Sequence, residues 1–134
     1  MENKYFLTEQ EINTVSGKIL DSAIEVHRHI GPGLIESIYE SCLCKEFDLR
    51  KISYKRQVSI PVKYKGEIVS SDLRIDVVVE SEIILELKSV ETMHPVFASQ
   101  LLSYLRLADK RLGLLINFNV PKLIEGFKRI VNKL

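Results

Sequence analysis

Two short aliphatic segments, residues 73–79 and 83–88, are separated by only three polar residues. Both segments are rich in valine, isoleucine and leucine, which is typical of β-strands, so the short polar connection predicts a hairpin. A hairpin centred on Ser81 pairs positions whose numbers sum to 162, and it places Asp76 opposite Glu86. A shift of one residue would place Asp76 opposite Leu87 and mix the polar and apolar faces. The pattern therefore favours a single register.

Alternation of side chains along the two strands assigns each residue to a face. The first strand is expected to place four aliphatic side chains together: Leu73, Ile75, Val77 and Val79. Asp76 then points the other way. In the second strand Glu86 and Lys88 share the face opposite to its aliphatic residues. The hairpin is thus predicted to carry two carboxylates and a lysine on one side.

Two chemical explanations fit this cluster. Opposed carboxylates repel each other, but a divalent cation between Asp76 and Glu86 would make the pair favourable. Lys88 beside them could position a water molecule or stabilise developing charge in a metal-assisted hydrolysis. Alternatively, the three residues form an ion-pair cluster on a solvated strand face. Such clusters are common, so these residues alone favour the second explanation.

Two helices are predicted before the hairpin. Thr8 and Glu11 form a capping-box pattern ahead of an apolar stripe with helical spacing, which predicts a helix over residues 9–30. Gly31-Pro32-Gly33 ends this helix, and a second helix follows over about residues 34–49. Its buried side is expected to contain six side chains: Ile35, Ile38, Tyr39, Cys42, Leu43 and Phe47.

Residues 54–64 alternate between polar and apolar, which predicts a further strand before the hairpin. Pro61 places this strand at a sheet edge or at a bulge, because proline cannot donate a backbone hydrogen bond. After the hairpin, Pro95 suits the first turn of a third helix that runs to about Asp109.

The last part of the chain contains one clear strand and one ambiguous segment. Residues 112–118 are almost continuously apolar, as in a strand that is covered on both faces. The tail from Pro121 fits a helix, but residues 127–131 could also pair as a strand. The order of helices and strands predicts an α/β or α+β fold with a mixed sheet.

Composition is that of one soluble globular domain of 134 residues, with 46% hydrophobic and 28% charged residues. No apolar run reaches the length of a membrane span, and the N-terminal residues do not resemble a secretory leader, so we expect a cytoplasmic protein. Cys42 and Cys44 diverge on the second helix and are predicted to be free thiols.

The net charge of +1 hides an uneven distribution. Basic and acidic residues number 3 and 7 in residues 1–44, 7 and 2 in 45–65, 2 and 7 in 66–91, and 7 and 2 in 92–134. An acidic segment with the candidate metal site is thus flanked by two basic segments. This arrangement suits a metal centre beside a phosphate-binding surface, but ordinary solvated faces would give a similar pattern.

Three polar residues outside the hairpin have plain structural explanations. Glu36 lies in the first turn of the second helix, where negative charge is favoured. Gln100 and Tyr104 are four residues apart on the third helix, and core packing or a surface polar pair explains them.

Together with the hairpin residues, however, they form a series of motifs that resembles a known family. Three motifs occur in sequence: G-x-x-E-x-x-Y at residues 33–39, D…E-x-K formed by Asp76, Glu86 and Lys88, and Q-x-x-x-Y formed by Gln100 and Tyr104. Together they resemble the GxxExxY proteins, a family assigned to the PD-(D/E)XK nuclease superfamily. The resemblance covers nearly the whole chain, although Ile75 stands where the superfamily name has proline.

The resemblance implies a restriction-endonuclease-like fold over a single domain, residues 1–134, with a mixed β-sheet flanked by α-helices. It implies that Asp76 and Glu86 bind Mg²⁺, or Mn²⁺ in its place, and that Lys88 is the catalytic lysine. Glu36 resembles an additional carboxylate ligand of the metal. Gln100 resembles the glutamine that supports the active site in RecB-type exonucleases.

The function implied is hydrolysis of phosphodiester bonds in nucleic acid, DNA in the first place. A homodimer would suit a small nuclease that must span a duplex. The alternative is a catalytically silent module that keeps the nuclease fold and binds nucleic acid or a protein partner, because a fold does not fix a function.

Overall fold

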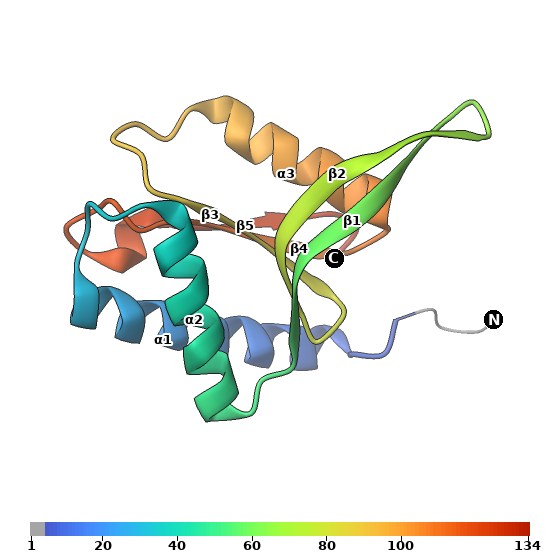
Figure 1. The fold of residues 1–134 in the computed structure, drawn as a ribbon. Helices are drawn as coiled ribbons and strands as arrows, with labels where there is room; N and C mark the ends of the chain where they lie inside the picture. The colour runs from blue at the N-terminus through green and yellow to red at the C-terminus, as the bar shows by residue number, and fades with distance from the viewer. Residues whose placement is uncertain (1–4) are drawn as a thin grey trace.

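The computed structural model describes residues 5–134 and contains one mixed β-sheet between helices (Figure 1). Residues 1–4 lie outside the described residues. They are part of the predicted domain and of the N-terminal segment for which no secretory leader was expected. In chain order the elements are α1 (Glu9–Ile30), α2 (Glu36–Arg50), β1 (Tyr54–Tyr64), β2 (Glu67–Val79), β3 (Ile83–Lys88), α3 (Pro95–Ala108), β4 (Leu112–Asn117), the 3₁₀ helix η1 (Leu123–Gly126) and β5 (Phe127–Val131).

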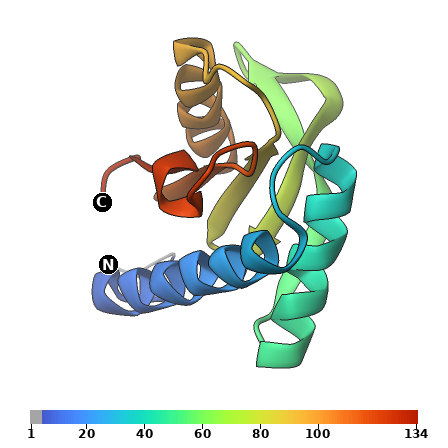
Figure 2. The ribbon, with the colours of Figure 1, turned by 90° about the vertical axis from the view of Figure 1, so that its left-hand side faces the viewer.

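The strands lie in the order β1-β2-β3-β4-β5, and β3 and β4 are the parallel pair. Parallel neighbours need a crossover connection, which α3 supplies. Helices α1 and α2 cover one face of the sheet, and α3 covers the other (Figure 2). The predicted α+β fold with a mixed sheet flanked by helices is confirmed. Within residues 5–134, none of the helices is long and apolar enough to cross a membrane.

The hairpin between β2 and β3 has the predicted register. Val77 pairs with Leu85, Val78 with Ile84 and Val79 with Ile83, so the paired numbers sum to 162. Both Glu80 and Ser81 in the turn have positive φ, 53° and 61°, which is the twist that favours tight hairpins. The ladder ends at the Val77–Leu85 pair, immediately before the two candidate carboxylates.

Strands β1 and β2 change face at the level of those carboxylates. Val77 and Val79 pack against α1 and α2, whereas Leu73 and Ile75 pack in the cluster around α3. The prediction that these four side chains share one face is therefore wrong. β1 departs from regular strand geometry at the same level, where Gln57, between the Arg56–Val77 and Val58–Ile75 pairs, has a φ of 50°.

Helix α2 begins later than predicted, at Glu36, and Ile35 is its extended N-cap residue. Ile35 and Ile38 are 66% and 41% exposed, so their predicted place on the buried side is wrong. The buried line of the helix consists of residues four positions apart, namely Tyr39, Leu43 and Phe47. Ile38 lies beside this line and Ile35 precedes the helix. Cys42 and Cys44 are free thiols, as predicted.

The ambiguous tail forms η1 and then the edge strand β5, so the strand alternative for residues 127–131 is confirmed. Gly126 explains why the chain can turn here. A Cβ atom at this position would lie 2.1 Å from the backbone oxygen of Asn117, so a larger residue would not fit. Pro61 lies in edge strand β1 beside a register shift, in agreement with its predicted role.

Candidate active site

Asp76 and Glu86 meet where the β2–β3 ladder opens. Asp76 Oδ2 accepts a hydrogen bond from the Leu87 N–H at 2.9 Å, and Glu86 Oε1 accepts one from the Asp76 N–H at 3.4 Å. Side-chain oxygens thus take the place that backbone carbonyls have in a regular ladder. These contacts hold the two carboxyl groups close together at one gap between the strands.

The environment of Glu86 makes its ionisation costly. Glu86 is buried, with 7% of its surface exposed. Burial raises the pKa of Glu86 to about 8, and the negative charge of Asp76 acts in the same direction. The hydrogen bond from the Asp76 N–H and the positive charge of Lys88 oppose this effect. An additional positive charge between the two carboxylates would therefore stabilise both in their ionised form.

Lys88 lies two positions beyond the buried glutamate, at the end of β3. Its Nζ is 4.4 Å from the centroid of the Phe97 ring, in the first turn of α3. That turn begins at Pro95, and His94 Nδ1 caps it by accepting a hydrogen bond from the Val96 N–H at 3.1 Å. The local rules that start α3 thus also place an aromatic ring against the candidate catalytic lysine.

Tyr104 brings the middle of α3 to the same carboxylates. Its pKa is raised first by burial and then by the negative charges of Glu86 and Asp76, whereas a hydrogen bond with Gln100 lowers it. Gln100 is itself exposed, one turn earlier on the helix. The structure therefore places Tyr104 near the carboxylates and Gln100 next to Tyr104.

Glu36 occupies a different part of this region. It is exposed, and it lines a surface hollow of about 400 Å³ together with Leu34 and Ser89. Ser89 directly follows Lys88, and its Oγ donates a hydrogen bond to the Leu34 oxygen at 2.5 Å. Among residues 5–134 there is no group of three or more His, Cys, Asp or Glu side chains arranged to hold a metal ion. Asp76 and Glu86 are thus brought together without Glu36.

Tyr39 anchors the loop that leads to Glu36. Its hydroxyl donates to the Gly31 oxygen at 2.5 Å and accepts from the Leu34 N–H at 3.2 Å. Its ring stacks on Phe118 with a centroid distance of 4.4 Å. The tyrosine of the G-x-x-E-x-x-Y motif therefore has a structural role.

Comparison with known families shows which superfamily the chain belongs to. A family model described as the PD-(D/E)XK nuclease superfamily matches residues 13–130. The chain belongs to this superfamily. No curated protein and no solved structure gives a significant match.

Nucleases of the PD-(D/E)XK superfamily typically use divalent metal ions, and the residues present fit such an ion. Asp76 and Glu86 supply carboxylate oxygens, which hard cations prefer, and their mutual repulsion would be relieved by a positive charge. Two protein carboxylates are compatible with Mg²⁺ because this ion usually keeps several of its water ligands. The predicted role of Glu36 as an additional ligand stays a prediction.

Two features of this superfamily member were not found from the sequence. The contact between Phe97 and Lys88 could not be predicted, because it depends on how α3 crosses the sheet. The second is Glu40, which is buried and accepts hydrogen bonds from Arg56 Nε and Gln57 Nε2, both at 2.9 Å. The sequence signal, a glutamate followed by a basic residue on the next strand, is too common to identify such a pair.

Proposed function

We propose that this protein is a metal-dependent nuclease that hydrolyses phosphodiester bonds, with Mg²⁺ or Mn²⁺ as the ion and DNA as the substrate. One observation supports this proposal most strongly. Asp76 and Glu86 converge in a buried gap that is unfavourable for two negative charges, and Lys88 lies beside them. A purely solvated ion-pair cluster would not bury Glu86 in this way.

Each residue has a distinct role in this proposal. Asp76 and Glu86 hold the ion, which when bound would polarise the phosphoryl group and acidify a water molecule. Lys88, positioned by the Phe97 ring, places its ammonium group near the attacked phosphate and stabilises the negative charge that develops there. Gln100 supports the site through Tyr104. Glu36 would be a further carboxylate ligand of the metal.

We further assign the chain to the GxxExxY group within the superfamily, on the strength of residues 33–39 and the loop that Tyr39 anchors. A cytoplasmic location and a homodimer belong to the same proposal. Sedimentation at several protein concentrations, with and without DNA, tests the dimer, and a monomer under all conditions would contradict it.

The deciding experiment combines metal binding with cleavage. Wild type, Asp76→Asn and Lys88→Ala are titrated with Mg²⁺ and Mn²⁺ by calorimetry and incubated with labelled single- and double-stranded DNA and RNA. Asp76→Asn should lose both metal binding and cleavage, whereas Lys88→Ala should still bind metal but fail to cleave. A control, Asp21→Asn on the exposed surface of α1, should behave as wild type. Cleavage that survives in Asp76→Asn would refute the proposed site.

A catalytically silent module is the second candidate, and the position of Glu36 favours it. Without this residue, only two carboxylates of the described chain meet at the site. Metal-dependent binding of nucleic acid by wild type, with no cleavage of any of the four substrates, would support this candidate over the first.

A further inference from the structure

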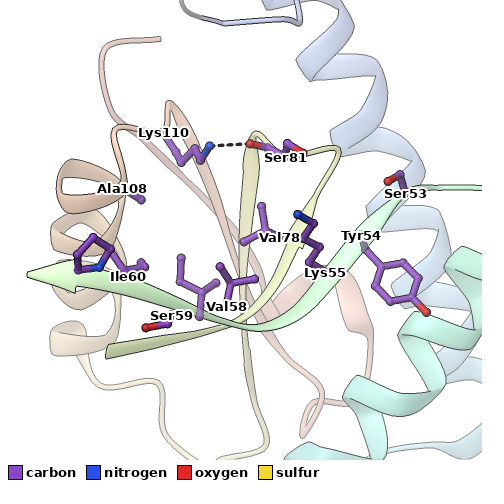
Figure 3. A pocket seen from close by; sticks show the side chains of 12 residues that line it. Ser53, Tyr54, Lys55, Val58, Ser59, Ile60, Val78, Ser81, Ala108 and Lys110 are labelled. Atoms are coloured by element: carbon purple, nitrogen blue, oxygen red, sulfur yellow. Dashed lines mark hydrogen bonds between the residues drawn. The ribbon is translucent and has the colours of Figure 1, made fainter. Parts of the chain in front are cut away.

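A surface cavity of about 280 Å³ lies on the α3 side of the sheet, outside the carboxylate cluster (Figure 3). Its apolar wall is built by two strands and one helix: Val58, Ile60 and Pro61 of β1, Ile75 and Val78 of β2, and Ala108 of α3. The cavity exists because α3 ends at Ala108, whose methyl group leaves the sheet beneath it uncovered. Asp109 then adopts a left-handed conformation that turns the chain away.

The rim of this cavity is positively charged. Lys55 rises from β1 beside Val78, and Lys110 reaches from the end of α3 to the hairpin turn (Figure 3). The Lys110 Nζ donates a hydrogen bond to the Ser81 oxygen at 2.7 Å, which fixes the ammonium group at the rim. An ammonium group has three donors, so donors remain for an anion. None of the twelve lining residues, all within the described part of the chain, carries a carboxylate.

The cavity is also adjacent to the candidate active site. Ile75 precedes Asp76 directly, and Val78 follows it by two residues, and both pack on the α3 side. Residues two apart in a strand are separated by about 7 Å. A group held in the cavity is therefore within the reach of one nucleotide from a phosphate held at the carboxylates.

We propose that the cavity binds an unpaired base of the substrate strand, next to the phosphate that is cleaved, while Lys55 and Lys110 bind the neighbouring phosphates. This inference rests on the proposed nuclease function and specifies its substrate as single-stranded nucleic acid. An apolar wall accepts the flat face of any base, and lysines follow the backbone, so the site tolerates different sequences. A base inside a duplex can enter the cavity only after it is unstacked and unpaired, which costs free energy and disfavours the duplex.

The test fills the cavity without touching the carboxylates. Ala108→Met places a long apolar side chain in the cavity, and Ser103→Met adds the same side chain on an exposed position of the same helix. Binding of a fluorescent thymidine homopolymer is measured by anisotropy in EDTA, so that no cleavage occurs. Ala108→Met should weaken binding about tenfold or more, the effect of losing one base contact, whereas Ser103→Met should bind as wild type.

Three further comparisons sharpen the result. A strand with abasic residues should bind wild type as weakly as the normal strand binds Ala108→Met. The duplex form of the strand should bind wild type more weakly and should be insensitive to Ala108→Met. Lys55→Glu, a rim change that leaves the core intact, should weaken binding more than Lys18→Glu on α1. Lys55→Glu also keeps the test valid if Ala108→Met fails to fold.

Several outcomes would overturn the inference: unchanged binding in Ala108→Met and Lys55→Glu, preference for the duplex, or competition by free thymidine monophosphate as strong as by the strand, which would indicate a small-molecule site. Cleavage with Mg²⁺ or Mn²⁺ is measured separately. If wild type cleaves but Ala108→Met leaves strand binding unchanged, this inference is wrong and the nuclease proposal stands. Cavity-dependent binding without any cleavage by wild type defeats the catalytic proposal alone.

Discussion

Replacing Glu86 with glutamine should stabilise the metal-free protein at high pH. The pKa of Glu86 is about 8 in the folded protein, against 4.5 for the free side chain. Because the pKa of Glu86 is raised in the folded protein, its contribution to the free energy of unfolding is fully present below pH 4.5. This contribution is lost progressively as pH rises from 4.5 through 8. A difference of 3.5 pKa units corresponds to about 5 kcal/mol at pH 9. Glu86→Gln removes the charge and should avoid this loss.

Urea unfolding in EDTA, followed by circular dichroism at pH 6 and pH 9, measures the effect. We expect wild type to lose about 3 kcal/mol of unfolding free energy between the two pH values, and Glu86→Gln to lose much less. Adding Mg²⁺ or Mn²⁺ at pH 9 should restore stability to wild type but not to the variant, because ligand binding to the folded state shifts the equilibrium.

A matched control uses another buried glutamate, Glu40, whose side chain contacts β1. Glu40 forms an ion pair with Arg56 at 2.9 Å, so Glu40→Gln should destabilise the protein at pH 9 by about 1.5–3 kcal/mol, the opposite sign. Equal pH dependence of wild type and Glu86→Gln would refute the reasoning, because it would mean that folding does not raise the pKa of Glu86.

Three other predictions follow from single contacts. Phe97→Leu should lower the cleavage rate a few-fold through loss of the Lys88 contact, about 0.5–1 kcal/mol, and Phe97→Tyr should restore it in the same single-turnover assay. Gly126→Ala should cost more than about 3 kcal/mol in urea unfolding, because the new Cβ meets Asn117 oxygen; a change below 1 kcal/mol would show that the turn adapts. Tyr39→Phe should cost about 1–3 kcal/mol by removing two hydrogen bonds to partly exposed backbone groups, at about 0.5–1.5 kcal/mol each, and thermal unfolding would show whether it does.

The parts of the fold that local rules determine could be predicted. The hairpin register follows from a short polar turn and from alternation, and both are properties of neighbouring residues. The capping box of α1 is present with both of its hydrogen bonds. The Thr8 side chain accepts one from the Glu11 N–H, and the Glu11 side chain accepts one from the Thr8 N–H. β4, which is apolar up to its last residue, Asn117, is buried throughout. In each case the nearby sequence contains all the information that the structure uses.

Elsewhere the outcome depends on residues distant in the sequence. The exposure of Ile35 and Ile38 reflects where α2 lies on the sheet, and helical periodicity cannot distinguish the centre of a buried stripe from its edge. The contact between Phe97 and Lys88 reflects the crossing of α3 over β3. In the same way, motif spacing indicated that Asp76 and Glu86 meet but could not show that Glu36 lies outside the pair.

The face switch at Gln57 shows how a distant contact shapes the site. Positive φ is unfavourable for glutamine, so some other interaction must hold it there. The buried Glu40 carboxylate provides that interaction, because it accepts hydrogen bonds from Gln57 and from Arg56. The switch allows β2 to pack Ile75 against α3 and, two residues later, to pack against α1 and α2. Asp76 lies at this transition, so we infer that an ion pair between α2 and β1 helps to aim the carboxylate on β2.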